Sequence, residues 1–163
     1  MTYHQHMQGC LSLEQKTLQP FKKIAEENGF HVYEKQGLDN RIFLEGKSNF
    51  QFGDLRVNTP THHVVIEAES AGGVTNLVKY WYCLSENAPP THISLPIILI
   101  HVFQQTSKND YDSHLKLWDF LWEKMQKEID SNRIQAYKFP YHIQNPSEFK
   151  RAIDKFEMSL TSF

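Results

Sequence analysis

The sequence predicts an α/β fold, a three-layer sandwich in which helices cover both faces of a mixed β-sheet. Apolar runs rich in β-branched residues, HVVIEA at 63–68 and LPIILIHV at 95–102, have the composition of buried strands. They alternate with segments whose apolar residues recur at helical spacing. Strands interleaved with helices in this way favour a sheet covered on both sides.

The composition is that of one globular domain spanning 1–163. The 17 Lys and Arg against 19 Asp and Glu give a formal charge of −2, which excludes a strongly basic, histone-like nucleic-acid binder. The two cysteines, Cys10 and Cys83, exclude a disulfide framework and a Cys-rich zinc site. The longest apolar run, 95–103, is too short to span a bilayer, and the N-terminus lacks the pattern of a signal peptide. We therefore expect a cytoplasmic protein with no membrane partner.

The N-terminal part reads as one helix followed by short strands. Within 12–28, Ser12 is placed to cap a helix and Gln15 stands at the capping-box position. Pro20 lies inside this segment, so the helix either kinks or restarts there. Candidate strands follow at 30–33, 41–44, 50–57 and 63–68. The last has three consecutive β-branched residues, which predicts a central position in the sheet.

The C-terminal part alternates helices with strands. The sequence predicts helix, strand, helix, strand and helix at 74–85, 95–102, 110–130, 134–139 and 146–158. The first of these helices has an apolar face predicted to pack on the sheet, made of Val74, Leu77, Val78 and Trp81. The long helix carries a wider stripe that either packs in the core or forms a homodimer face, made of Leu115, Trp118, Trp122, Met125 and Ile129.

Three acidic residues stand at the ends of two neighbouring strand segments. Asp54 follows a glycine at the start of one segment, and Glu67 and Glu69 end the next. Residues i and i+2 of a strand point to the same face, so the two glutamates project together. A turn near Asn58 would pair the segments antiparallel and bring Asp54 opposite them. The alternative is that the glutamates form a charged strand end facing solvent.

Three carboxylates in one place repel one another, and a hard divalent cation removes that repulsion. Oxygen ligands alone suit Mg²⁺ or Mn²⁺ rather than zinc. Such an ion polarises a phosphoryl oxygen and lowers the pKa of a bound water. The helix that follows Gly72 and Gly73 would also offer its first amides to a phosphate. The chemistry predicted is hydrolysis of a phosphodiester.

An Asp after a short β-run, and an apolar strand that ends in Glu-x-Glu about a dozen residues later, resemble the PD-(D/E)xK nuclease superfamily. The resemblance implies that Asp54 and Glu67 are the acids of the motif. Glu69 then occupies the position usually held by lysine, where some type II restriction endonucleases carry Glu. Gly53 stands where the family usually has proline.

The resemblance also implies a restriction-endonuclease-like core of order α-β-β-β-α-β, which covers about 12–103 and leaves about 104–163 as a C-terminal α/β extension. Lys79 and Asn76, on the helix after the motif, could replace part of the role of the missing lysine by contacting the phosphate or the attacking water. Glu27, or its neighbour Glu26, could add a carboxylate from the first helix, as first-helix acids do in parts of the superfamily. The alternative for Lys79 is a solvent-exposed helix lysine, and the alternative for Glu26 and Glu27 is a pair of acids at a helix terminus with no role in the site.

Two histidines are also candidates. His63, in the turn before the central strand, could contact a nucleic-acid backbone, although a histidine pair in a turn is usually just exposed. His101, on the apolar strand, is predicted to be a core histidine with satisfied hydrogen bonds.

The function predicted from the sequence is that of a metal-dependent DNA endonuclease that uses Mg²⁺, with Mn²⁺ able to substitute, and that could act as a homodimer to cut both strands. Its catalytic residues would be Asp54, Glu67, Glu69 and Lys79, and its metal ligands Asp54, Glu67, Glu69 and Glu27. Asn76 and His63 would contact the nucleic acid. The alternative is a non-catalytic module of the same fold that binds nucleic acid or protein, favoured by Glu69 in the lysine position and by the mildly acidic charge. In a third reading the chain is an unrelated α/β interaction protein whose three carboxylates do not meet.

Overall fold

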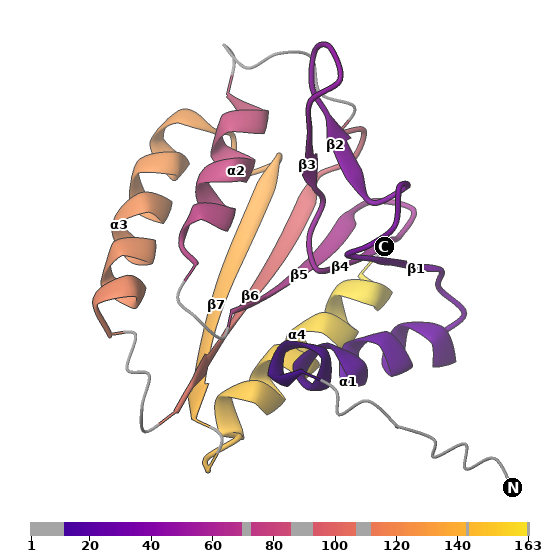
Figure 1. Cartoon of the computed structure of the whole chain (residues 1–163), viewed down its shortest axis with the longest axis vertical. Helices are drawn as coiled ribbons and strands as arrows, with labels where there is room; N and C mark the ends of the chain where they lie inside the picture. Colours follow the sequence, from indigo (N-terminus) through magenta and orange to yellow (C-terminus); the bar gives the residue numbers. More distant parts are fainter. Residues whose placement is uncertain (1–11, 70–72, 86–92, 107–111, 143, 163) are drawn as a thin grey trace, which may run out of the picture.

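The computed structural model describes residues 12–69, 73–85, 93–106, 112–142 and 144–162 (Figure 1). Its main sheet has five strands in the order β1-β4-β5-β6-β7. They are β1 (Val32–Glu34), β4 (Leu55–Asn58), β5 (His63–Glu69), β6 (Ile97–Gln105) and β7 (Ile134–His142). The β1–β4 and β4–β5 pairs are antiparallel, whereas β5–β6 and β6–β7 are parallel. The predicted mixed sheet is therefore present, with β5 at its centre.

Two helices cover each face of this sheet (Figure 1). They are α1 (Leu13–Glu27) and α4 (Ser147–Thr161) on one face, and α2 (Thr75–Leu84) and α3 (Asp112–Glu128) on the other. Alternate residues of β5 point to opposite faces of the sheet. Val64 and Ile66 pack in the core with α1 and α4, whereas Val65 packs in the core with α2 and α3. The predicted three-layer α/β class is confirmed.

The first helix begins as the sequence predicts. Ser12 and Gln15 form a complete capping box. The helix then runs without interruption through Pro20, so neither a restart nor a new cap occurs there. Pro20 has no amide hydrogen to donate to the carbonyl of Lys16, and Lys16 is exposed, which leaves that carbonyl to solvent.

One predicted strand, 41–44, and the first part of another, 50–57, do not join the main sheet. β2 (Arg41–Phe43) and β3 (Asn49–Gln51) pair only with each other, as a separate hairpin. The run 50–57 is divided at Gly53, which adopts φ +85. A Cβ at this position would overlap Cγ1 of Val65, so the strand break requires glycine and excludes the proline typical of the resembled family.

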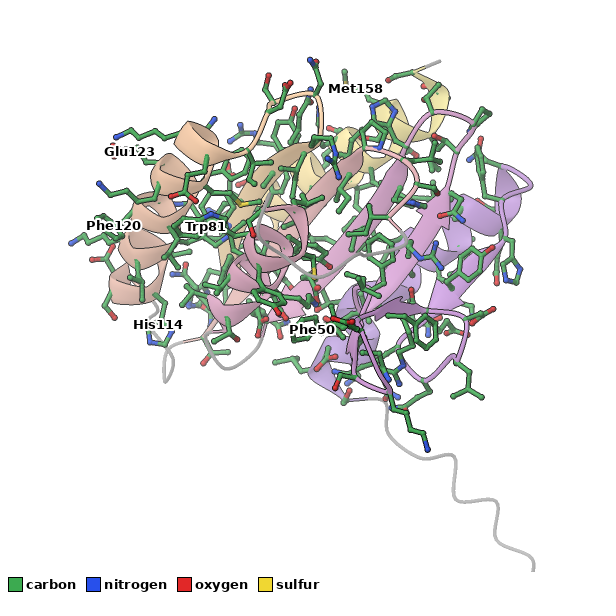
Figure 2. All side chains as sticks on the ribbon, turned by 90° about the horizontal axis from the view of Figure 1, so that it is seen from above. Phe50, Trp81, His114, Phe120, Glu123 and Met158 are labelled. Carbon is green, nitrogen blue, oxygen red and sulfur yellow. The ribbon has the colours of Figure 1, made fainter. Side chains whose placement is uncertain are left out.

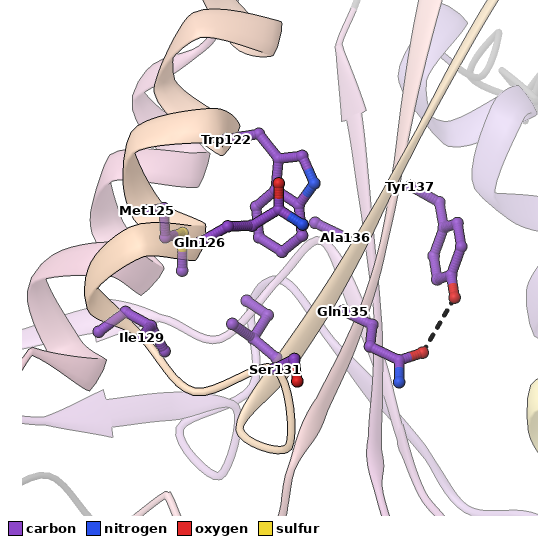
Figure 3. Close-up of a pocket in the computed structure, with 9 residues that line it drawn as sticks. Trp122, Met125, Gln126, Ile129, Ser131, Gln135, Ala136 and Tyr137 are labelled. Carbon is purple, nitrogen blue, oxygen red and sulfur yellow. Dashed lines mark hydrogen bonds between the residues drawn. The ribbon is translucent and has the colours of Figure 1, made fainter.

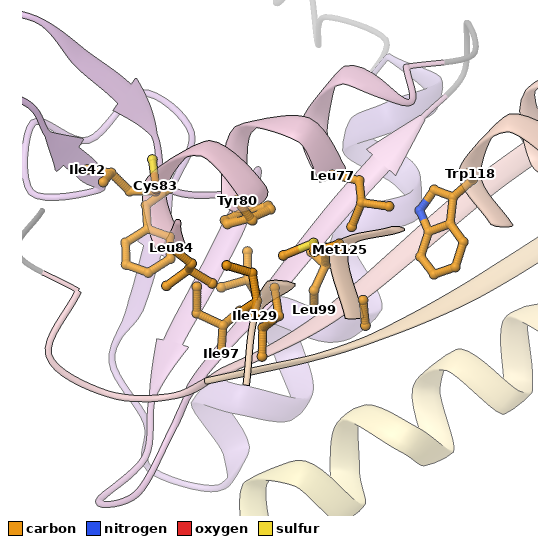
Figure 4. Close-up of a cluster of buried hydrophobic side chains, with 14 of the residues drawn as sticks. Ile42, Leu77, Tyr80, Cys83, Leu84, Ile97, Leu99, Trp118, Met125 and Ile129 are labelled. Atoms are coloured by element: carbon orange, nitrogen blue, oxygen red, sulfur yellow. The ribbon is translucent and has the colours of Figure 1, made fainter. Parts of the chain in front are cut away.

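The buried face of α2 differs from the predicted one. Val78, expected against the sheet, is 41% exposed, and the buried residues are Leu77, Tyr80, Cys83 and Leu84 (Figure 4). On this face the hydroxyl of Tyr80 donates a hydrogen bond to Glu67 of β5.

The aromatic stripe of α3 belongs to the core. Trp118, Met125 and Ile129 are buried against α2 and the sheet, which confirms core packing for this stripe. The exposed apolar residues of α3 are Leu117 and Phe120, outside the stripe. No helix in the described segments has the length and apolar character needed to cross a bilayer.

Candidate active site

A polar cavity of about 390 Å³ lies where β4, β5 and the start of α2 meet. Five of the residues singled out in the sequence line it: Asp54, Glu67, Glu69, Asn76 and Lys79. Its other charged lining residues are Glu14 of α1 and Lys35, just after β1. Carboxylates and ammonium groups from five segments of the chain therefore face one space.

Asp54 is fixed by hydrogen bonds on both of its carboxylate oxygens. The backbone amide of Ala68 donates to Oδ2 at 2.8 Å, and Gln51 Nε2 donates to Oδ1 at 2.9 Å. Lys35 Nζ lies 3.3 Å from Oδ1. The side chain is only 6% exposed, so its direction is set by the neighbouring strand and by the β2–β3 hairpin rather than by solvent.

Glu67 is the most deeply buried acid of the cavity, at 1% exposure. Its Oε1 accepts hydrogen bonds from Lys79 Nζ and from the hydroxyl of Tyr80, both at 2.6 Å. Burial raises the pKa of Glu67, because desolvation outweighs the opposing effect of Lys79, and the nearby charge of Asp54 raises it further. The Lys79 ammonium thus compensates a carboxylate that is almost completely shielded from bulk solvent.

Glu69 lies closer to the opening and is partly exposed. Asn76 Nδ2 donates to its Oε1, and His101 Nε2 lies 3.6 Å from the same oxygen. The absence of a side chain at Gly73 makes room for this carboxylate, since a Cβ there would lie 2.6 Å from both carboxylate oxygens. The helix and the glycine before it therefore position Glu69 together.

His101 is fully buried, as a core histidine should be, but one of its nitrogens faces the cavity wall. Trp118 Nε1 donates to Nδ1 at 3.0 Å, and an indole nitrogen can only donate. The proton of the neutral ring therefore sits on Nε2, toward Glu69. Nε2 has no hydrogen bond within the described residues, so the predicted full satisfaction holds for only one ring nitrogen.

Two predicted residues lie elsewhere. Glu27 is exposed at the far end of α1, where its Oε1 lies 3.7 Å from Lys23 Nζ. The α1 carboxylate in the cavity is Glu14, about 20 Å away along the helix axis. The packing of α1 brings its first turn to the cavity, which corrects the choice of Glu27.

His63 is not placed to contact a nucleic-acid backbone, which corrects the second expectation. It is 4% exposed, and its Nδ1 lies 2.7 Å from Asn58 Oδ1. Its ring packs edge-on against Phe52. Burial, and then the charge of Arg56, lower the pKa of His63 to about 4, so the ring is neutral at neutral pH.

The cavity holds more negative than positive charge. Four carboxylates line it against two ammonium groups, those of Lys35 and Lys79. Lys35 Nζ donates to Glu14 Oε1 at 2.8 Å and also lies near Asp54, while Lys79 lies against Glu67. No three His, Cys, Asp or Glu side chains of the described segments are grouped as ligands of one metal ion. The donor set is nonetheless all oxygen, which is the set that Mg²⁺ and Mn²⁺ prefer.

A second cavity, of about 310 Å³, lies between α3 and the edge strand β7 (Figure 3). Its walls include Trp122, Met125 and Ile129, and no carboxylate or ammonium group lines it. A third cavity, of about 400 Å³, is lined by Lys138, Arg151, Asp154 and Lys155, with a single carboxylate among them. The cavity that gathers several carboxylates is the polar one at β4, β5 and α2.

Four residues of the polar site carry no signal in the sequence. Glu14, Lys35 and Gln51 reach it from three separate segments, and Tyr80 reaches Glu67 from beneath α2. A charged residue in a first helical turn or after a short strand is ordinary, so only tertiary contact identifies these residues. Comparison of the chain with protein-family models, curated proteins and solved structures found no match.

Proposed function

We propose that the polar cavity is the active site of a metal-dependent endonuclease that hydrolyses phosphodiester bonds of DNA. The observation that carries the proposal is that Asp54, Glu67 and Lys79, from two strands and a helix, line one cavity. The pairing of β1, β4 and β5 as antiparallel neighbours, followed by α2 and a parallel β6, supports the restriction-endonuclease-like order of elements.

Each residue has a role that its surroundings favour. Asp54, Glu67 and Glu69 would hold Mg²⁺, which supplies a Lewis acid for the phosphoryl oxygen and a more acidic water when bound. Glu69, the most accessible of the three acids, is the best placed to take a proton from the attacking water. Lys79 and Lys35 offset the charge of the phosphate, and the amide of Ala68 keeps Asp54 aimed into the cavity.

One observation favours a non-catalytic module of the same fold as the second candidate. Lys79 already neutralises Glu67 at 2.6 Å, in a pair that is almost completely buried. A buried ion pair of this kind can shift the pKa of its carboxylate in a protein that has no catalytic use for it. A module of this kind would bind nucleic acid or protein without cutting, and would have no need of a divalent cation.

The test is a cleavage assay on duplex and single-stranded DNA with Mg²⁺ or Mn²⁺. We expect Asp54→Asn and Glu67→Ala to abolish cutting, and Gly73→Ala to reduce cutting because the new Cβ displaces the Glu69 carboxylate. Glu27→Gln is the matched control, an exposed carboxylate outside the cavity, and should cut like the wild type.

Calorimetric titration with Mn²⁺ separates the two candidates. The nuclease proposal expects binding that is lost in Asp54→Asn. A wild type that neither cuts DNA nor binds Mn²⁺ would refute the nuclease and support the non-catalytic module. Binding of Mn²⁺ without cleavage of any DNA would keep the metal site and refute DNA as the substrate.

A further inference from the structure

An aromatic wall stands at one end of the polar cavity. Phe50 lines the cavity, and its ring centroid lies 6.0 Å from that of Tyr82 at an interplanar angle of 80°. We call these two residues the Phe50–Tyr82 wall. Tyr82 is 44% exposed, so one of the two rings presents a large surface to solvent beside the site.

The wall is continuous with the polar part of the cavity along α2. Asn76, Lys79 and Tyr82 follow one another at steps of three residues, and the first two line the cavity. Residues three apart on a helix have Cβ atoms about 5–6 Å from each other. Tyr82 therefore stands one step beyond the ammonium group that we assign to the phosphate.

The two rings of the wall differ in burial. Phe50 is partly buried and packs against the core on the α2–α3 side of the sheet, whereas Tyr82 is 44% exposed. Because the two rings are nearly perpendicular, the exposed ring of Tyr82 is the one that can offer its face to a ligand. An aromatic face beside a cavity suited to a cation and a phosphate fits a ligand that has both an anionic and a flat aromatic part. A nucleotide has both.

The charge of the chain bears on the form of this ligand. Binding to a duplex depends mainly on basic groups that contact many phosphates, whereas this chain has a formal charge of −2 and an acidic cavity. Stacking of a base on an aromatic side chain adds about 1–3 kcal/mol per base, which lowers the number of phosphate contacts that binding needs. In a duplex each base is already stacked and paired, so only an unpaired base reaches an aromatic wall.

We infer that the Phe50–Tyr82 wall stacks an unpaired nucleobase next to the phosphate in the cavity, so that the substrate is single-stranded or locally unpaired nucleic acid. This inference rests on the proposed function in taking the cavity as the phosphate end of the site.

The test measures binding with Ca²⁺ in place of Mg²⁺, because the acidic cavity needs a hard, oxygen-binding cation to hold the phosphate. The probe is a short single-stranded DNA that carries 2-aminopurine, whose fluorescence falls when the base stacks on an aromatic ring. We expect quenching by the wild type, and dissociation constants about 5- to 150-fold weaker for Tyr82→Ala. Tyr82→Trp should restore binding, because it keeps an aromatic face.

The matched control is Phe120→Ala. Phe120 is 53% exposed on α3, far from Phe50 (Figure 2), and its removal should leave the dissociation constant unchanged. Thermal unfolding of each variant identifies any loss of folded protein, and Phe50→Leu provides a second variant that keeps the apolar volume while removing the ring.

The possible outcomes separate this inference from the proposed function. No quenching by the wild type, equal affinity in Tyr82→Ala, or equal affinity for the same sequence as a duplex would overturn the aromatic wall. Metal-dependent cutting of duplex DNA that is insensitive to Tyr82→Ala would also overturn it while leaving the nuclease in place. Stacking that depends on Tyr82, in a protein that never cuts, would support the wall and refute the nuclease.

Discussion

Replacing Lys79 by methionine would remove the ammonium group that lies 2.6 Å from Glu67 Oε1 and leave the side-chain volume nearly unchanged. The two side chains are 9% and 1% exposed, so water cannot take the place of the lost partner. The carboxylate of Glu67 would keep only the hydrogen bond from the Tyr80 hydroxyl. The folded state must then hold an uncompensated charge or bind a proton.

Breaking one side of a buried ion pair costs about 3–5 kcal/mol. We expect Lys79→Met to lose about this much free energy of unfolding at pH 8. For a domain of this size that corresponds to a fall in Tm of about 6–20 °C. Replacing both partners, in Lys79→Met with Glu67→Gln, leaves two neutral groups of similar shape. The double variant should therefore lie within about 2 kcal/mol of the wild type.

The stability lost in Lys79→Met should increase as the pH rises. Burial raises the pKa of Glu67 above its ordinary 4.5, and removing Lys79 raises it further, since Lys79 opposes the shift. The folded variant then binds more protons than the unfolded chain, so its stability falls as the pH rises through the folded pKa. The cost of Lys79→Met should be greatest at pH 8, and smallest below about pH 4.5, where Glu67 is protonated in both states.

Urea unfolding followed by tryptophan fluorescence at several pH values measures these differences. Lys116→Met is the matched control, because it breaks an exposed pair with Asp112 at 2.8 Å and should change nothing measurable. The reasoning is refuted if Lys79→Met is as stable as the wild type at pH 8, or if the double variant is as unstable as the single one.

Two further predictions concern the frame around the site. Both Gly53 and Gly46 have positive φ, but of the two only Gly53 would place a Cβ against Val65. In thermal unfolding, Gly53→Ala should therefore lose about 1–3 kcal/mol more stability than Gly46→Ala. Equal losses in the two variants would contradict this prediction. The pKa of His63 is lowered from 6.5 to about 4, so the unfolded chain binds more protons over that range and stability should rise with pH between about 4 and 6.5. His63→Gln should flatten this slope in urea unfolding, and titration of the His63 ring near pH 6.5 by NMR would contradict the prediction.

Local periodicity in the sequence was enough for the central strands of the sheet and for part of the site, but not for the separate pairing of β2 with β3. The capping box at Ser12 depends on residues three positions apart, and the run 63–68 has the composition of a central strand. The common direction of Glu67 and Glu69 follows from the alternation of any strand. These features involve neighbours along the chain, so the sequence alone determines them.

Contacts between distant segments could not be predicted in the same way. Which end of α1 reaches the cavity depends on how that helix crosses the sheet, and this crossing brings Glu14 rather than Glu27. The face that α2 buries contains Tyr80, whose hydroxyl donates to Glu67 of β5, a contact that no spacing within the helix reveals. Val78 lies outside this face and is exposed.

By itself, then, the sequence determined the α/β class, the central strand and the pair of acids at its end. Tertiary structure decided which ammonium groups compensate the acids of the cavity, namely Lys79 for Glu67 and Lys35 for Asp54. It also decided that His63 is buried and neutral. The physical reason is that secondary structure is set by local geometry, whereas the burial and pairing of a charge depend on which surfaces come together when the layers pack.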